Sequence, residues 1–329
     1  MYKSKSLFLI TTISGTLITM SSNNWISMWM GLELNMMSFI PLISKQENKE
    51  SSESAMIYFL TQSMGSMILM FSILMMIMAT NSFMAESFNT MIMMSLMIKL
   101  GAAPFHSWLP EIMTKMSWMS CLMLLTWQKL APLSMVSNVQ MNQWTMIMAS
   151  VMSTMVGAIG GLNQTSLRKL MGYSSINHLG WMISINTIQN NWLIYWIIYT
   201  IMTTMMFIMF NKMNIYFINQ MNSVNMTWTE KINYMVSMMS MGGLPPLLGF
   251  LPKWIVIQEL MNNKMIMMVI IMIMMSMMTL FYYMRIMMSM IFQFSMINKW
   301  SYINSPINIT SYFLIINLSM PVIMIINLI

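Results

Sequence analysis

Five ionisable side chains lie inside stretches of sequence that are otherwise apolar enough to cross a membrane. They are Glu33, Lys99, Lys129, His178 and Lys253. A charged side chain at the centre of a membrane helix costs about 2.5 to 3.5 kcal/mol on insertion scales, so such residues usually pair with one another or line a wet path. A carboxylate, three amines and an imidazole at membrane depth can pass a proton from one to the next. For one such residue, a helix–helix hydrogen bond or a side chain reaching the interface is an equally good interpretation, but five together favour a proton path.

Glu33 and Lys99 are the two members of this set with opposite charge. We expect them to lie at similar depth and to neutralise each other, and we predict that making and breaking this pair moves a proton. Lys129, His178 and Lys253 would extend the relay across the bundle. A charged lysine has three donors and no acceptor, so water and polar side chains must complete the path.

The stretch Met97–Pro110 places a helix break directly after Lys99. Gly101 and Pro104 interrupt an apolar run, and proline lacks the backbone N–H that an α-helix needs. The surrounding segment of about thirty residues would be about 45 Å long as a straight helix, against a hydrocarbon core of about 30 Å. Non-helical backbone at this depth is tolerated where it is buried in protein or lines a wet cavity. We therefore expect a broken helix beside Lys99.

A second long segment, residues 231–261, carries the same kind of interruption. Gly242, Pro245 and Pro246 lie in its middle, and Lys253 follows them. If spans one to five and six to ten are two repeats, each broken helix is the fourth of its repeat, and the odd number of spans inverts the second copy. Interrupted helices at matching positions of inverted repeats are typical of a transport path near the midplane. No direct sequence similarity between the halves is evident, so this interpretation depends on spacing and breaks.

The composition indicates an all-α polytopic membrane protein. Hydrophobic residues make up 57% of the 329 residues and charged residues 7%, whereas a soluble domain has about 25% charged residues. Apolar runs predict eleven transmembrane helices in one domain, 1–329, with repeat one at about 6–137, repeat two at about 143–291 and a final helix at about 309–328. The eleven spans are expected at 6–21, 24–43, 54–79, 86–115, 117–137, 143–162, 171–189, 192–211, 231–261, 264–291 and 309–328.

The charges outside the predicted site indicate topology. Eleven basic residues, among them Arg285, fall on one side of the predicted bundle and only Lys264 falls on the other, which places the N-terminus inside and the C-terminus outside. The longest connections, 44–54 and 212–230, are expected to be exposed. Glu86, Glu111, Glu230 and Glu259 lie near span ends and His106 follows the first break, so these five residues are expected to be solvated or interfacial.

Several classes of function are excluded or disfavoured. The single Cys121 excludes a disulfide framework and a cysteine-ligated zinc or iron–sulfur site. The sequence shows no phosphate loop, nucleophile triad or His/Cys cluster, so we expect no bound cofactor and no metal. The net charge of +7 comes from short clusters, which disfavours nucleic-acid binding. The 57 methionines and the absence of aspartate indicate translation of an AT-rich gene with a mitochondrial code.

Three stretches carry a resemblance to a known family, at 101–110, 163–181 and 242–254. They resemble the mitochondrial NADH dehydrogenase subunit 2 family of respiratory complex I, as it occurs in invertebrates, and the resemblance extends over nearly the whole chain. This family belongs to an antiporter-like group that is related to subunits of sodium/proton antiporters. The resemblance implies two inverted five-helix repeats around a hydrophilic axis, with Glu33, Lys99, Lys129 and Lys253 at the key positions and His178 as a further member.

The same resemblance implies a core membrane subunit of proton-pumping NADH:ubiquinone oxidoreductase in the mitochondrial inner membrane. The N-terminus would lie in the matrix and the C-terminus in the intermembrane space. NADH, FMN, iron–sulfur clusters and ubiquinone would be bound by other subunits. The implied partners are antiporter-like subunit 4, subunit 4L, the lateral helix of subunit 5 and membrane lipids. Two alternatives stay open, a subunit of a cation/proton antiporter and a passive membrane scaffold that conducts nothing.

Overall fold

The computed structural model describes residues 2–44, 49–78, 82–139, 143–186, 191–222, 228–291, 308–319 and 321. Within these ranges the regular structure is helical, apart from one isolated β-bridge between Ser166 and Phe217. The helices form two compact units, Met1–Ser153 and Thr154–Ile329, which are described separately here. The boundary falls inside the helix Gln143–Gly161, the first span of the predicted second repeat. The expected all-α structure is confirmed.

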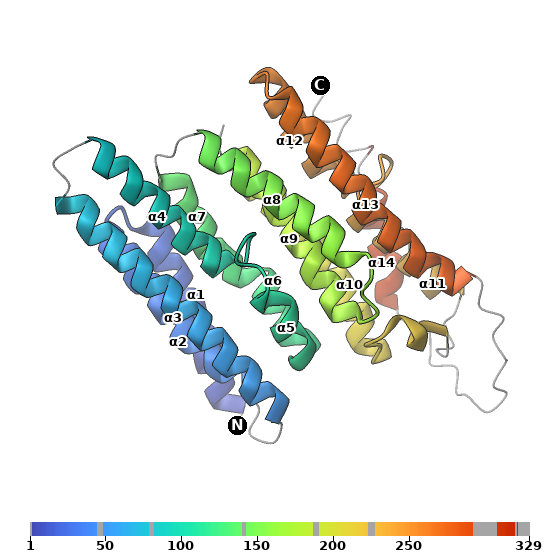
Figure 1. The fold of residues 1–329 in the computed structure, drawn as a ribbon. Helices are drawn as coiled ribbons and strands as arrows, with labels where there is room; N and C mark the ends of the chain where they lie inside the picture. Colours follow the sequence, from blue (N-terminus) through green and yellow to red (C-terminus); the bar gives the residue numbers. More distant parts are fainter. Residues whose placement is uncertain are drawn as a thin grey trace. The chain divides into compact units, whose positions relative to one another are not determined.

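In unit 1 each of the first three predicted spans is a single helix, and each of the next two is interrupted. It contains α1 (Tyr2–Ser21), α2 (Trp25–Ile43), α3 (Lys49–Met78), α4 (Ser82–Leu100), α5 (Trp108–Lys115), α6 (Trp118–Leu125), the 3-10 helix η1 (Trp127–Lys129), α7 (Leu130–Asn138) and the start of α8 (Gln143–Gly161). Helix α2 packs between α1 and α3, and α3 also packs on α4 and α5 (Figure 1). Helices that follow one another in the chain are therefore neighbours in space.

Unit 2 repeats the broken fourth span of unit 1, but its next span, Ile266–Ile291, is one continuous helix. It contains the rest of α8, α9 (Leu167–Asn186), α10 (Trp192–Met213), the 3-10 helix η2 (Ile218–Asn222), α11 (Trp228–Gly242), α12 (Phe250–Asn262), α13 (Ile266–Ile291) and α14 (Asn308–Asn317). Helix α9 packs on α10, α12 and α13, and α11 packs on α10, α13 and α14. The last predicted span begins as expected, and most of its second half lies outside the described residues.

Five described helices are individually long and apolar enough to cross a membrane, namely α2, α3, α8, α10 and α13. Helix α9 has the length, but its buried residues include Ser174, Ser175, Asn177 and His178. Polar groups are costly in hydrocarbon and are tolerated where protein or water satisfies them. A long helix that is both polar and buried is therefore suited to the interior of a bundle.

The first predicted break ends α4 in a Schellman motif. Gly101 has φ +69°, which places it in the left-handed region. Its N–H donates to the Ile98 carbonyl (3.2 Å), and the N–H of Ala102 donates to the Met97 carbonyl (3.1 Å). These two bonds satisfy the last carbonyls of a helix, and glycine adopts the required backbone at little cost.

The second predicted break ends α11 in the same way. Gly243 has φ +83°, its N–H donates to the Ser240 carbonyl (3.0 Å), and the N–H of Leu244 donates to the Met239 carbonyl (3.3 Å). The turn therefore uses Gly243. Gly242, which was expected to break the helix, is the last residue of α11.

The chain follows the same spacing after both breaks. Helix α5 begins seven residues after Gly101, and α12 begins seven residues after Gly243. Aligned on these glycines, the matched positions are Pro104 with Pro246, Leu109 with Leu251, and Pro110 with Pro252. The two halves thus share the pattern Gly-x-x-Pro-x4-Leu-Pro, and the expectation that they lack direct similarity was wrong here. Aligning the two breaks on Gly243 would have revealed the pattern.

A third interruption, not predicted from the sequence, lies within the expected span 117–137. After α6, residues Trp127–Lys129 form one turn of 3-10 helix before α7 begins. In a continuous helix the N–H of residue 132 would donate to the Gln128 carbonyl, but Pro132 has no N–H and its ring clashes with that carbonyl. Pro132 thus explains why Lys129 lies on a local break.

The connection at 212–230 is less exposed than expected. Ile215 and Met221 are buried, and the N–H of Leu167 donates to the Tyr216 carbonyl (2.9 Å). This bond belongs to the β-bridge that joins the connection to the residues just before α9. Because the described part of the connection folds back on unit 2, Ile215 and Met221 join the core.

Two charged residues lie deeper than the sequence predicted. Glu230, expected to be solvated, is only 6% exposed in the first turn of α11. Arg285, counted among the loop charges, lies inside α13 and donates to the carbonyls of Leu162 (2.6 Å) and Gln164 (2.8 Å). Those carbonyls lie just beyond the end of α8, where a helix leaves acceptors unsatisfied. Arg285 therefore joins α13 to the end of α8.

We expect Gly243→Ala to destabilise the protein more than Gly242→Ala, although the two residues are adjacent. The left-handed region costs an L-residue about 1 to 2 kcal/mol, and a Cβ on Gly243 would lie 2.8 Å from Nζ of Lys253. A Cβ on Gly242 would meet Leu280 at an ordinary 3.5 Å. Thermal unfolding of the two variants in native membranes tests this, and equal midpoints would contradict the assignment of the turn to Gly243.

Candidate functional site

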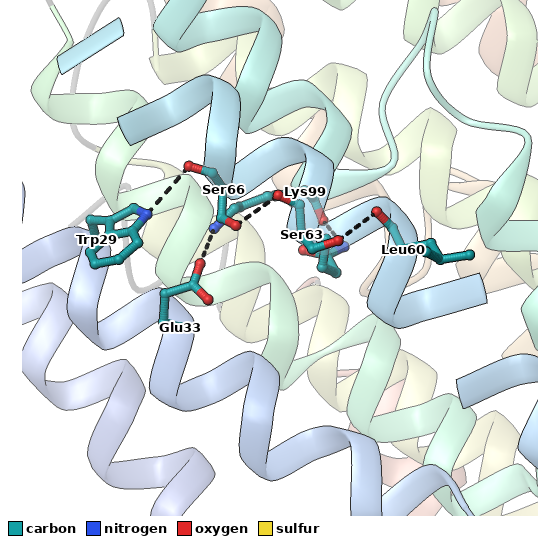
Figure 2. Close-up of polar contacts among 7 residues, drawn as sticks. Trp29, Glu33, Leu60, Ser63, Ser66 and Lys99 are labelled. Carbon is teal, nitrogen blue, oxygen red and sulfur yellow. Dashed lines mark hydrogen bonds and ion pairs between the residues drawn. The ribbon is translucent and has the colours of Figure 1, made fainter. Parts of the chain in front are cut away.

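Glu33 and Lys99 approach each other within unit 1. Glu33 lies in the middle of α2, and Lys99 is the next-to-last residue of α4. Nζ of Lys99 is 3.9 Å from Oε1 of Glu33 (Figure 2). This distance is too long for a hydrogen bond. The pair is therefore an electrostatic contact without a direct hydrogen bond.

The surroundings of the pair are asymmetric. The Lys99 side chain is 3% exposed and that of Glu33 is 22% exposed, but Oε1 of Glu33, the oxygen that faces Lys99, is itself buried. Trp29 donates its Nε1 to the Ser66 carbonyl (3.3 Å) and ties α2 to α3 beside the pair (Figure 2). A Cβ on Gly65 would lie 3.1 Å from Cγ of Lys99. Glycine there allows the lysine stem to lie directly against α3.

The end of α4 is held by side chains from two other helices. Trp108, the first residue of α5, donates its Nε1 to the Ile98 carbonyl (3.2 Å). Gln62 of α3 donates its Nε2 to the Lys99 carbonyl (3.2 Å). The C-terminal end of a helix carries partial negative charge, which stabilises a cation in its last turn. The break thus provides a favourable place for the Lys99 ammonium.

Lys99 and Lys129 line the same small cavity in unit 1. Its volume of about 20 Å³ is enough for about one water molecule. Lys129, on η1, is buried. The polar side chains that share the lining are Asn35, Tyr58, Gln62 and Gln128. Both lysines therefore border a space that is large enough for about one water molecule.

Lys253 is buried beside the second break in unit 2. It is the fourth residue of α12, and its Nζ donates to the Gly242 carbonyl (2.8 Å) at the end of α11. Its Nζ also lies 6.0 Å from the centre of the Trp181 ring on α9, near the limit of a cation–π contact. Lys253 thus reaches back across its break to the same kind of helix end that carries Lys99.

His178 is buried on α9 next to two tyrosines of α10. Its Nδ1 lies 2.8 Å from the hydroxyl of Tyr195, within hydrogen-bond distance, and its ring centre lies 5.0 Å from that of Tyr199. Trp181, which contacts Lys253, follows His178 by about one helical turn, a rise of about 4.5 Å. Adjoining turns of α9 therefore approach the environments of His178 and Lys253.

The structure brings Glu33, Lys99 and Lys129 together in unit 1, and it places His178 and Lys253 around α9 in unit 2. Proton transfer from Lys129 to a residue of unit 2 stays a prediction. Sequence reasoning missed the polar residues that line the cavity. Tyr58 and Gln62 are four residues apart in an apolar span, a spacing that places them on one helix face, and this was the available signal.

Two of the residues that were expected to be solvated or interfacial have accessible side chains. His106 is half-buried in the first break and donates Nδ1 to the Pro104 carbonyl (3.1 Å), and Glu111 is exposed on α5. Across the residues that the structure describes, no group of three His, Cys, Asp or Glu side chains is placed to hold a metal ion.

Comparisons with known proteins agree on one family. The family model described as "NADH:quinone oxidoreductase/Mrp antiporter, TM" matches residues 22–279. NADH-ubiquinone oxidoreductase chain 2 of Locusta migratoria is 47% identical over 301 residues, which covers 90% of this chain and 88% of the relative. The chain 2 protein of Anopheles gambiae is 41% identical over 305 residues, covering 90% and 89%.

Solved structures with low sequence identity share the fold. A chain of respiratory complex I from Thermus thermophilus has a TM-score of 0.80 at 20% identity, covering 87% of this chain and 70% of that chain. A chain of the Mrp complex from Dietzia sp. has a TM-score of 0.77 at 13% identity, covering 91% and 61%. Since the family model and the insect relatives each match most of its length, the chain belongs to the family of antiporter-like membrane subunits that includes NADH-ubiquinone oxidoreductase chain 2.

Proposed function

We propose that the chain is a core membrane subunit of proton-translocating NADH:ubiquinone oxidoreductase, respiratory complex I, and that it carries protons without a redox centre of its own. The path would run along Glu33, Lys99, Lys129, His178 and Lys253. The observation that carries this proposal is the Glu33–Lys99 ion pair beside a water-sized cavity that Lys99 shares with Lys129. The relatives named NADH-ubiquinone oxidoreductase chain 2 support the assignment to this complex.

In unit 1 the Glu33 carboxylate controls the charge of Lys99. When the carboxylate is close, it stabilises the ammonium, and at an effective dielectric constant of about 20 two charges 4 Å apart interact by about 4 kcal/mol. Protonation or displacement of Glu33 removes that stabilisation, and the proton of Lys99 moves toward Lys129. Moving one charge against 100 mV takes about 2.3 kcal/mol. The interaction is therefore large enough to matter for a pumping step.

In unit 2 the relay ends at Lys253. The Gly242 carbonyl and the end of α11 stabilise its ammonium. His178 has the Tyr195 hydroxyl on its Nδ1, and an imidazole can both take up and release a proton, so His178 is the intermediate carrier in this proposal. The transfer of a proton from Lys129 to His178 is part of the same proposal.

Other subunits would hold the redox chemistry and the neighbouring proton paths. NADH, FMN, iron–sulfur clusters and ubiquinone would be bound outside this chain. We infer contacts with antiporter-like subunit 4, subunit 4L, the lateral helix of subunit 5 and lipids. The chain is a multi-pass subunit of a multi-subunit membrane complex, and the proposed site is the mitochondrial inner membrane with the N-terminus in the matrix and the C-terminus in the intermembrane space.

A cation/proton antiporter subunit is the second candidate, because the chain of the Mrp complex shares the fold. The identity of 47% to an insect chain 2 protein favours complex I. A passive scaffold would have no need for buried lysines beside two helix breaks.

Lys129→Met is expected to lower the number of protons pumped per electron while the complex still assembles, because methionine has a similar length and cannot carry a proton. The ratio is measured in membrane vesicles from the initial rates of NADH oxidation and of lumen acidification. An unchanged ratio with normal assembly would support the scaffold. Sodium-dependent transport by the chain would support the antiporter.

Glu33→Gln is expected to slow coupled turnover by about tenfold or more, since the charge interaction with Lys99, about 4 kcal/mol at an effective dielectric constant of about 20, is lost. Glu259→Gln serves as the matched control, because Glu259 lies near the end of α12 and outside the proposed path. Both variants are measured as proton pumping at matched amounts of complex. Equal and negligible effects would contradict the role of the Glu33–Lys99 pair.

A further inference from the structure

One wall of the cavity between Lys99 and Lys129 is a connected chain of hydrogen bonds. The hydroxyl of Tyr58 donates to Oε1 of Gln128 (3.3 Å), and Nε2 of Gln128 donates to Oδ1 of Asn35 (2.9 Å). These three residues come from α3, η1 and α2, and all three line the cavity. Asn35 and Tyr58 are buried.

We propose that these three side chains, the Tyr58–Gln128–Asn35 clamp, hold one water molecule between Lys99 and Lys129, and that Tyr58 and Gln128 are positioning residues for proton transfer between the lysines. The inference rests on the proposed function, because it assumes that the two lysines exchange protons. It adds one water site and two positioning residues to the five ionisable groups of the proposed path.

The donors and acceptors around the cavity explain why such a clamp is needed. A charged lysine offers three donors and no acceptor, so when Lys99 is charged only the neutral amine of Lys129 can accept a hydrogen bond from the water, and the second O–H of the water needs another acceptor. Tyr58 commits its only proton to Gln128, which leaves the hydroxyl oxygen as an acceptor. Oε1 of Gln128 accepts this one bond and keeps a second lone pair. The clamp therefore supplies an acceptor for the second O–H of the water.

The proton step then balances without any other reactant. The N–H bond of the Lys99 ammonium breaks as its proton joins the water, and an O–H bond of that water breaks as a proton joins the neutral amine of Lys129. Lys99 becomes a neutral amine, Lys129 becomes an ammonium, and the water is restored with its hydrogen bonds reoriented. Amides are neither useful acids nor useful bases here, so Gln128 and Asn35 orient the water and carry no proton.

The clamp also connects the first helix break to the turn that carries Lys129. The Tyr58 ring lies edge-on to Phe39 (5.3 Å between centroids) and to Trp108 (6.2 Å). Trp108 is the residue that donates to the end of α4, and Gln128 is adjacent to Lys129 on η1. A shift of either break would therefore move the acceptors of the water site.

Tyr58→Phe tests the clamp, because it removes the hydroxyl and keeps the ring packing. We expect proton pumping by the assembled complex to fall about threefold to tenfold, the range for one lost hydrogen bond. The solvent deuterium isotope effect on coupled NADH oxidation should rise, because proton transfer becomes slower than the other steps. Gln128→Met should have the same effects. A purely structural role would lower the amount of complex and leave the isotope effect unchanged.

Two comparisons sharpen the experiment. The double variant Tyr58→Phe/Gln128→Met should be no slower than the slower single variant, because both changes break one network. Tyr234→Phe is the matched control, since the buried Tyr234 hydroxyl contacts Sδ of Met221 (3.3 Å) in unit 2, and it should pump normally. Additive losses, or an equal loss in Tyr234→Phe, would overturn the proposal.

The outcomes also separate this inference from the proposed function. Normal pumping in Tyr58→Phe, together with lost pumping in Lys129→Met, overturns the clamp and leaves the function standing. Normal pumping in Lys129→Met overturns both. If the variants fail to assemble, a high-resolution density map of the unaltered complex decides. Water density within hydrogen-bond distance of the Tyr58 oxygen supports the site, and a dry cavity overturns it.

Discussion

A helix that ends inside a membrane leaves its last carbonyls without intrahelical partners, and the candidate site depends on how these carbonyls are satisfied. In unit 1, Gln62 and Trp108 donate to the end of α4, and Lys99 lies in the last turn of that helix. In unit 2, Lys253 itself donates to the last carbonyl of α11. The negative end of a helix favours an ammonium group. Each break therefore creates a place where a buried lysine can remain charged.

The two units differ in what else controls that charge. Lys99 has a carboxylate at 3.9 Å, and a carboxylate can itself be protonated or move away. The partner of Lys253 is a backbone carbonyl, which has no proton to gain near neutral pH. In the proposed path, the charge of Lys99 would therefore depend on a titratable neighbour, and the charge of Lys253 would also depend on the position of the break.

The existence of the breaks and the helix order could be predicted from the sequence, because glycine, proline and apolar periodicity act locally. The particular turn residue could not, since Gly242 and Gly243 are both glycine and only their backbone angles distinguish them. The 3-10 turn at Lys129 was missed because Pro132 acts on a carbonyl four residues earlier. The burial of Glu230 and the Tyr58–Gln128–Asn35 clamp depend on segments far apart in the sequence.

The shared pattern at the two breaks shows what the fold constrains. Aligned on Gly101 and Gly243, Lys99 corresponds to Met241, and Lys253 corresponds to Glu111. Neither lysine has a charged counterpart of the same sign. Lys99 lies in the last turn before its break, and Lys253 lies after its break and donates to the carbonyl that ends α11. Glu111, at the position of Lys253, is exposed, so the shared pattern does not require a buried charge there. The repeated backbone thus determines the turn and the start of the next helix, and a buried lysine can stand on either side of the break.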